Sequence, residues 1–186
     1  MVVGSGGQMS YFAKMKGTTK SPPGVSLTEV ALSWLGSFIG ITVVAILQSL
    51  FFDGTDLVLM IGSFGASAVL VYGAVKSPLA QPRNLLGGHV LSALIGVGAF
   101  TIFQSQPVLA AAAAVATAIA VMHATKTLHP PGGATALIAV IGGEKVHSLG
   151  FLYAVVPAGV GAAVLLVVAL LFNNIPKGRR YPEFWY

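Results

Sequence analysis

The chain has 186 residues, of which 55% are hydrophobic and only 8% are charged. Soluble domains average about 25% charged residues, so this composition excludes an ordinary soluble domain and predicts a protein that lies mainly in lipid. The formal net charge is +5, but the basic residues flank apolar runs instead of forming a stripe, which is typical of membrane topology and not of nucleic-acid binding.

Residues 1–28 form the first predicted element, a tail on the cytoplasmic side of the membrane. They contain neither the apolar core of a signal peptide nor the Arg-rich amphipathic pattern of a transit peptide. The tail carries positive charge at Lys14, Lys16 and Lys20, which suits the cytoplasmic side.

Six apolar runs follow, and each is predicted to be a membrane segment. A bilayer core about 30 Å thick needs roughly 20 helical residues. The segments are 30–52, 57–75, 85–103, 108–128, 131–143 and 149–172, within a single transmembrane domain at 29–175 that precedes a cytoplasmic tail at 176–186. The fifth segment is too short for an ordinary crossing, so a short, bent or re-entrant helix is predicted there. The expected fold class is an all-α membrane protein.

The charges beside these runs favour six crossings over five. With six crossings and both termini in the cytoplasm, Lys145 is the only one of the ten basic residues outside. Five crossings would place Lys177, Arg179 and Arg180 outside as well. Because cytoplasmic segments carry the excess of Lys and Arg, we predict six crossings with both termini inside.

A short internal repeat accompanies this organisation. The residues GASA at 65–68 recur as GATA at 133–136, and each half of the chain reads as a long span, a Gly-interrupted segment and a long span. Three spans per half place the halves in opposite orientations, the 3+3 inverted repeat of many transporters. A chance recurrence in a chain rich in Gly and Ala stays open as the alternative.

The densest polar run lies between the fourth and fifth segments. Pro130 disfavours helix at His129, and Pro131 suits the first turn of a new helix. The first free amides of that helix are expected at Gly132, Gly133, Ala134 and Thr135, where the positive end of a helix suits a small anion. Lys126 and His129 add charge or donors nearby. A cytoplasmic turn, with Lys126 as a simple charge anchor, is the structural alternative.

The matching segment of the first half supplies a second candidate wall of this site. Ser63, Gly65 and Ser67 bring two hydroxyls and a small residue to corresponding positions. Small residues are also common wherever membrane helices pack closely, so ordinary helix packing is the alternative interpretation.

Other polar residues are candidates for a transport pathway. His89 and His123 lie within apolar runs, where a polar side chain is either functional or hydrogen-bonded between helices. Arg83 and Asn84 are expected in a loop at the membrane interface, where Arg83 could attract anions to a cytoplasmic mouth.

Enzyme, metal and cofactor chemistry has little support. The sequence has no cysteine, which excludes thiol catalysis and cysteine-bound metal. The carboxylates lie at the ends of spans or in loops, so a buried acid–base pair is not expected. They are Glu29, Asp53, Asp56, Glu144 and Glu183. We therefore expect no enzyme activity, no metal and no cofactor.

The sequence resembles the HPP family of integral membrane proteins, named for a His-Pro-Pro motif. The resemblance covers residues 62–186, with small departures at Gly132 and Gly133, where many members have Ala. It rests on TLHPPGGATAL at 127–137, SFGASAVLVYG at 63–73, SPLAQPRNLLGGH at 77–89, Asn173-Asn174, and Arg180-Tyr181-Pro182.

This resemblance implies a function. Family members in cyanobacteria and plastid envelopes are associated with nitrite transport, so transport of nitrite or a similar small monovalent anion is expected. Without a transit peptide the chain resembles the bacterial form, in the cytoplasmic membrane. Descriptions of the family often count four spans, against the six predicted here. A membrane-embedded sensor or scaffold without transport activity is the alternative, and a homo-oligomer, by default a dimer, is the expected assembly.

Overall fold

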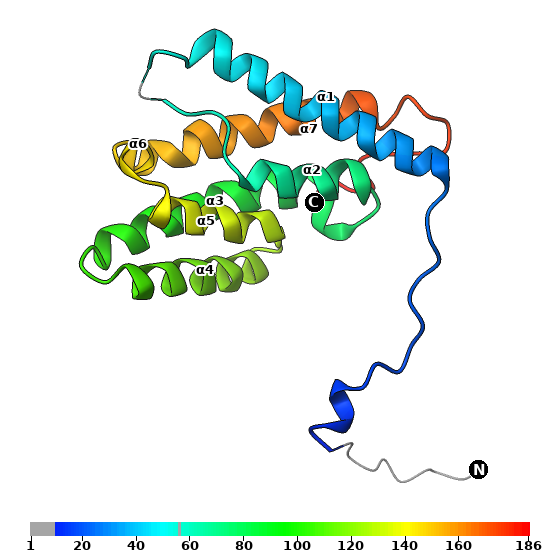
Figure 1. Ribbon diagram of the computed structural model, residues 1–186, viewed down its shortest axis with the longest axis horizontal. Coiled ribbons are helices and arrows are strands. Elements are labelled where there is room, and N and C mark those ends of the chain that lie inside the picture. The colour runs from blue at the N-terminus through cyan, green and yellow to red at the C-terminus, as the bar shows by residue number, and fades with distance from the viewer. Residues whose placement is uncertain (1–9, 56) are drawn as a thin grey trace.

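The computed structural model describes residues 10–55 and 57–186. From residue 27 onwards the described chain forms a bundle of helices, and residues 10–26 run away from it (Figure 1). Residues 1–9 of the predicted tail, and Asp56, lie outside the described residues. The described ranges hold helices and no strand, which confirms the all-α class. The α-helices are α1 Leu27–Phe51, α2 Ser63–Gly73, α3 Pro82–Ile102, α4 Pro107–Ala124, α5 Pro130–Ile141, α6 Glu144–His147 and α7 Val160–Phe172. Short helical turns are η1 Ala13–Met15, η2 Pro78–Ala80, η3 Gly150–Ala154 and η4 Val155–Gly159.

Four stretches of the described chain are long and apolar enough to cross a membrane. They are α1, α3, α4 and the stretch Gly150–Phe172, which ends in α7. Two other apolar helices, α2 with 11 residues and α5 with 12, are shorter. At 1.5 Å per residue these two reach about 16–18 Å, roughly half of a bilayer core. The short fifth segment is thus confirmed, while the second segment is shorter than the sequence predicted.

The second segment begins with a non-helical stretch, since residues 57–61 have no regular secondary structure. The side chain of Gln48 in α1 stabilises this stretch, since its Oε1 accepts hydrogen bonds from the amides of Leu59 and Met60. The helix prediction over 57–75 is wrong for this part. Hydropathy measures only how apolar the side chains are. A non-helical apolar segment that packs against protein therefore has the same high hydropathy as a helix.

The last segment, predicted as one helix over 149–172, is kinked. Val156, inside η4, has extended backbone angles, φ −128° and ψ 119°, so the regular helix α7 begins only after this kink. Pro157 follows, and a proline cannot donate the helical hydrogen bond and crowds the preceding turn. Proline also marks the other boundaries, since α3, α4 and α5 each begin at one.

The helices run back and forth between two ends of the bundle (Figure 1). At one end, which we call the basic end, α1, α3 and α5 begin and α2, α4 and α7 stop. Nine of the ten Lys and Arg residues lie at this end or in the segment before α1. Lys145, in α6, lies at the other end. The charge asymmetry read from the sequence is therefore an asymmetry of the folded molecule.

Helix α3 is central to the packing, because it contacts α4, α5, α7 and both turns η3 and η4. Glycines let α3 and α5 approach closely. A Cβ on Gly96 of α3 would come within 3 Å of the Ala136 carbonyl oxygen of α5. Such contact between backbones is the usual role of small residues between membrane helices. It places the polar side chains of α3 and α5 within reach of each other.

Candidate functional site

Five polar side chains meet inside the bundle, from α2, α3 and the start of α5. All five are buried, with at most 1% of each residue exposed. They are Ser63, Ser67, His89, His129 and Thr135. Polar side chains at membrane depth are costly, so a closed group of five is a functional candidate by default.

The hydroxyl of Ser67 lies between two imidazole rings. Its Oγ is 2.7 Å from Nε2 of His89 and 3.0 Å from Nε2 of His129. The ring centroids of the two histidines are 5.1 Å apart. One oxygen position is thus held in hydrogen-bond reach of two ring nitrogens that come from different helices.

The outer nitrogens of both rings are also paired. Nδ1 of His129 is 2.8 Å from the Leu79 carbonyl oxygen of η2. Nδ1 of His89 is 2.7 Å from Oγ1 of Thr135, which is itself 2.9 Å from Oγ of Ser63. Among the described residues, every buried side-chain nitrogen and oxygen has a hydrogen-bond partner.

With both rings neutral, the Leu79 carbonyl orders the protons of His129, Ser67 and His89. A carbonyl oxygen only accepts, so His129 carries its proton on Nδ1 and accepts at Nε2 from the hydroxyl of Ser67. Ser67 then accepts from Nε2–H of His89, whose Nδ1 accepts from Thr135. The hydroxyl of Thr135 can instead donate to Oγ of Ser63, 2.9 Å away. From His89 to Leu79 the donors point the same way, because His89 donates to Ser67, Ser67 to His129, and His129 to the Leu79 carbonyl oxygen.

Local sequence explains the position of His129. It is extended, with φ −141° and ψ 104°, because the residue before a proline is disfavoured in helix. Two side chains of α3 hold the preceding turn: Arg83 donates to the Thr125 carbonyl oxygen at 2.6 Å, and Asn84 donates to that of Leu128 at 2.8 Å. Both were predicted in a loop, but α3 already begins at Pro82.

The prediction of a free amide at Gly132, at the start of α5, is wrong. Pro130 and Pro131 have no N–H, and the amide of Gly132 donates to the His129 carbonyl oxygen at 2.8 Å. The two prolines remove the donors that a helix start ordinarily leaves unpaired. Gly132 instead serves packing, because a Cβ there would lie 2.7 Å from the Gly88 carbonyl oxygen.

Four other predicted site residues lie away from the cluster. Lys126 and His123 are exposed, and Lys126 occupies a tight turn with φ 57°. Gly65 is exposed on α2, and nothing lies within 4 Å of where its Cβ would point. Gly133 is half-buried and faces Val115 of α4. Helical periodicity explains the last two, since side chains two residues apart point in different directions.

Ala134 is half-buried next to Gly133 and carries no polar side chain.

Two groups that the sequence did not single out complete the cluster. The Leu79 carbonyl binds His129, and the hydroxyl of Tyr153 donates to the Thr135 carbonyl oxygen at 3.1 Å. The sequence did offer a signal for Tyr153, because it is a residue with a polar hydroxyl in an otherwise apolar run, shortly before Pro157.

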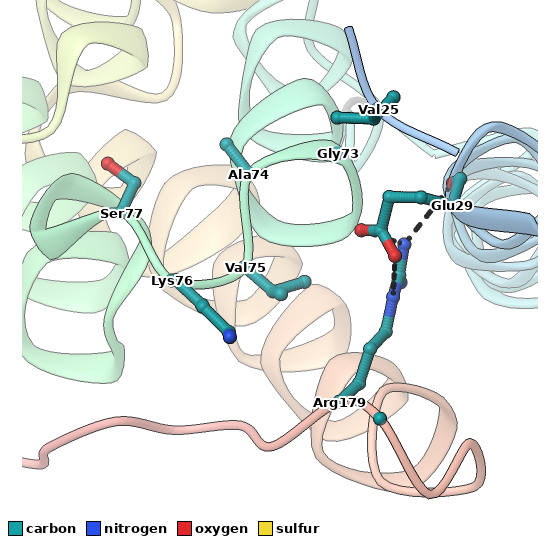
Figure 2. A pocket seen from close by; sticks show the side chains of 9 residues that line it. Val25, Glu29, Gly73, Ala74, Val75, Lys76, Ser77 and Arg179 are labelled. Carbon is teal, nitrogen blue, oxygen red and sulfur yellow. Dashed lines mark hydrogen bonds and ion pairs between the residues drawn. The ribbon is translucent and has the colours of Figure 1, made fainter. Parts of the chain in front are cut away.

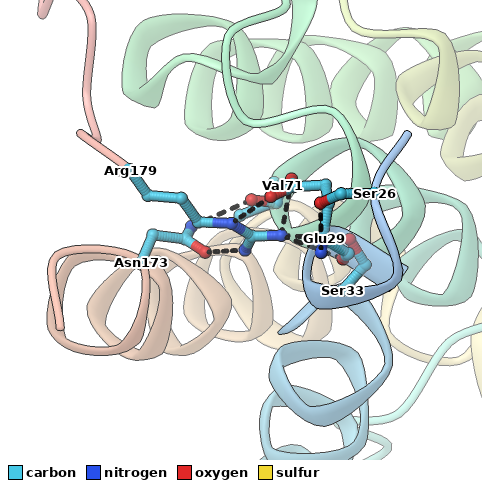
Figure 3. A network of polar contacts seen from close by, with 6 residues as sticks. All are labelled: Ser26, Glu29, Ser33, Val71, Asn173 and Arg179. Atoms are coloured by element: carbon cyan, nitrogen blue, oxygen red, sulfur yellow. Dashed lines mark hydrogen bonds and ion pairs between the residues drawn. The ribbon is translucent and has the colours of Figure 1, made fainter. Parts of the chain in front are cut away.

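A second polar cluster lies at the basic end (Figure 3). The guanidinium of Arg179 is 2.7 Å from the Glu29 carboxylate and also donates to Asn173 and Ser33. Asn173 in turn donates to the Val71 carbonyl oxygen of α2. These bonds tie the segment after α7 to the start of α1 and to α2.

A pocket of about 430 Å³ adjoins this second cluster (Figure 2). Glu29, Lys76 and Arg179 all line it. The pocket therefore presents charges of both signs, and Arg179 is already engaged by its partners. Its arrangement is that of a structural clamp, and the five-residue cluster remains the stronger candidate site.

The fold and the buried cluster together define a polytopic α-helical integral membrane protein. The family model for the HPP transmembrane region matches residues 22–182, so the chain belongs to the HPP family.

Two curated relatives from Dictyostelium discoideum are described only as transmembrane proteins. One is 48% identical over 181 residues, covering 96% of this chain and 58% of the relative. The other is 44% identical over 183 residues, covering 96% of this chain and 64% of the relative. The chain thus spans about three-fifths of the length of these relatives. No solved structure matches it.

Proposed function

We propose that this protein transports a small monovalent oxyanion across the membrane through the buried cluster, with nitrite the favoured substrate. The observation that carries the proposal is the position of the Ser67 oxygen between Nε2 of His89 and Nε2 of His129. An oxygen of nitrite is a hydrogen-bond acceptor of similar size, so the same two nitrogens can hold it when both carry protons. The preference for nitrite itself comes from the family resemblance.

The two short helices support this choice of site. Ser63, at the start of α2, pairs with Thr135 inside α5, and Ser67, one turn later, pairs with His129 just before α5. The two half-length helices therefore run in opposite directions past the cluster. Interrupted helices that meet near the middle of the membrane are where transporters commonly bind their substrates.

Packing supports the 3+3 inverted repeat within this proposal. α1 packs against α2 of its own half and α7 of the other, and α4 packs against α5 and α3 in the same relation. The offset of 68 residues pairs Ser67 with Thr135; Ser67 hydrogen-bonds both histidines and Thr135 hydrogen-bonds His89. Six segments, with the basic end in the cytoplasm, follow from this arrangement and from the positive-inside rule. We place the chain in the bacterial cytoplasmic membrane.

Nitrite uptake into liposomes that contain only this protein tests the proposal. The wild type is expected to take up nitrite faster than protein-free liposomes. His129→Ala is expected to lower the rate about tenfold or more, since a hydrogen bond to a charged ligand contributes about 1.5–3 kcal/mol. His123→Ala is the matched control, because His123 is exposed at the same end.

Two outcomes would contradict the proposal in different ways. Wild-type liposomes no faster than protein-free ones, with nitrite, nitrate and formate alike, would favour the sensor or scaffold alternative. Normal uptake per folded molecule by His129→Ala would leave transport standing but remove the cluster as its site.

A further inference from the structure

The cluster lacks a fixed positive charge to balance an anion. Lys126 is exposed, Arg83 is bound to the Thr125 carbonyl oxygen at the basic end, and Arg179 is paired with Glu29. A lone anion at membrane depth costs several kcal/mol in the absence of a balancing charge. If the site carries anions, as proposed above, the balancing charge must arrive with them.

The titratable groups around the cluster leave few sources for that charge. The described parts of α2 contribute only hydroxyl groups to the cluster, and η2 contributes the Leu79 carbonyl. From α3 comes His89, from the start of α5 comes His129, and from η3 comes the hydroxyl of Tyr153. α4 contributes Met122, which lies beside Ser92. α7 contributes only apolar and small residues. No Lys, Arg, Asp or Glu of the described chain hydrogen-bonds to any of the five side chains. Only the imidazole pair can carry an added proton.

We propose that the site takes up one proton with each anion, so that transport is an electroneutral proton–anion symport. The added proton binds the lone pair on Nε2 of His129; no covalent bond is broken, and the hydrogen bond from the Ser67 hydroxyl to Nε2 is lost. Nε2 of both rings then bears an N–H aimed at the oxygen of Ser67. The Ser67 hydroxyl turns to the Ser63 carbonyl oxygen, 3.3 Å away, which already lies within its reach.

This rearrangement produces a positively charged pair of donors that converge on one oxygen position. Once the Ser67 side chain rotates out of this position, an oxyanion oxygen that enters it receives two N–H bonds and neutralises the imidazolium. A single imidazolium or a single oxyanion is unstable at this depth. The two together have no net charge, so burying them as a pair costs far less free energy. When the anion leaves, the proton leaves Nε2 of His129 and the neutral chain described above is restored. This inference rests on the proposed transport function and adds its coupling.

Separate driving forces test the coupling in liposomes that contain the wild-type protein. In one arm a pH difference of one unit, alkaline inside, is imposed with the membrane potential clamped at zero by potassium and valinomycin. In the other arm a potential is imposed at equal pH. One proton per anion predicts a limiting nitrite ratio raised about tenfold by the first arm. It predicts no change from the second arm. Protein-free liposomes correct for diffusion of nitrous acid.

The outcomes separate coupling from transport. Uptake that follows the potential and ignores the pH difference would overturn the symport while transport stands, and no uptake in either arm would overturn transport itself. The double substitution His89→Gln with His129→Gln keeps hydrogen-bonding side chains without titratable nitrogens. Proton-driven uptake is expected to disappear in this variant, and its persistence would show that the proton binds elsewhere. His147→Gln, outside the cluster, is the matched control and is expected to remain proton-driven.

Discussion

Ser67 joins two imidazoles through one hydroxyl, and its removal leaves both without a partner. In Ser67→Ala, Nε2–H of His89 loses its acceptor and Nε2 of His129 loses its donor. Unpaired buried groups cost about 1–3 kcal/mol, so we expect the free energy of unfolding to fall by that amount. Thermal unfolding in mild detergent measures it.

Ser92→Ala provides the matched control on α3. Ser92 is equally buried, but its only described partner is the Met122 sulfur at 3.6 Å, a weak acceptor. We expect its loss to change stability less than the loss of Ser67. Equal losses for the two serines would contradict the bridging role of Ser67.

Adjacent glycines of the His-Pro-Pro segment have opposite expected sensitivities. A Cβ on Gly132 would lie 2.7 Å from the Gly88 carbonyl oxygen, 2.8 Å from Oγ of Ser92 and 2.9 Å from Sδ of Met122. Gly132→Ala is expected to destabilise the protein by about 1–3 kcal/mol, the usual effect of overpacking. Gly133→Ala meets its nearest atom at 3.9 Å, so we expect it to be neutral or to stabilise by roughly 0.5–1 kcal/mol.

Folded yield and thermal unfolding of the two variants measure this difference. The amide-binding hypothesis drawn from the sequence expects added bulk at either Gly132 or Gly133 to block the anion. Loss of function in Gly133→Ala with normal folded yield would restore that hypothesis.

At the scale of elements, a buried ion pair fastens the C-terminal segment to α1 and α2 (Figure 3). The side chain of Arg179 is 3% exposed and that of Glu29 is 30% exposed. Arg179→Ala is expected to cost about 2–3 kcal/mol, somewhat less than for a fully buried pair because water reaches Glu29.

Thermal unfolding with Arg180→Ala as the control measures the contribution of this clamp. Arg180 is the exposed neighbour with the same charge, so its removal is expected to change little. A similar loss in both variants would mean that net charge, and not the clamp, sets stability. If the clamp only fastens the ends of helices, Arg179→Ala should keep its nitrite uptake per folded molecule.

At the scale of the whole molecule, the alternation of helices predicts that both ends of the chain share one side of the membrane. The start of α1 and the end of α7 lie together at the basic end, joined by the pair of Glu29 and Arg179. Reporter fusions at Gly24 and after Tyr186 are expected to be cytoplasmic. Reporters on opposite sides would contradict six crossings and the inverted repeat together.

Assembly is the second prediction at this scale. Large apolar side chains such as Trp34, Phe38 and Val108 are exposed along α1 and α4. Lipid covers part of such surface, and small residues between them allow close contact with another copy. We predict a homo-oligomer, with a symmetric dimer as the simplest form. Mass measurement in mild detergent checks this, and a monomer at every concentration would contradict it.

The sequence alone determined the class, the approximate positions of most helices and the family. Low charge, apolar runs and prolines at helix starts are local features, so they predicted an all-α membrane protein with a short fifth helix. Four of the predicted site residues, Ser63, Ser67, His129 and Thr135, and the pathway residue His89 indeed meet in one cluster. Their residue types carried the information, because polar side chains in apolar runs need partners.

Only the tertiary structure decided which of those residues meet and in which roles. Contacts between α2, α3 and α5 join positions 22 to 72 residues apart, which no local pattern specifies. The orientation of each helix turned Gly65 and Gly133 away from the cluster, and pairing of the Gly132 amide with the His129 carbonyl removed one of the expected anion-binding amides. Hydropathy likewise did not reveal the non-helical stretch before α2 or the kink at Val156, because apolar side chains favour burial without fixing the backbone that carries them.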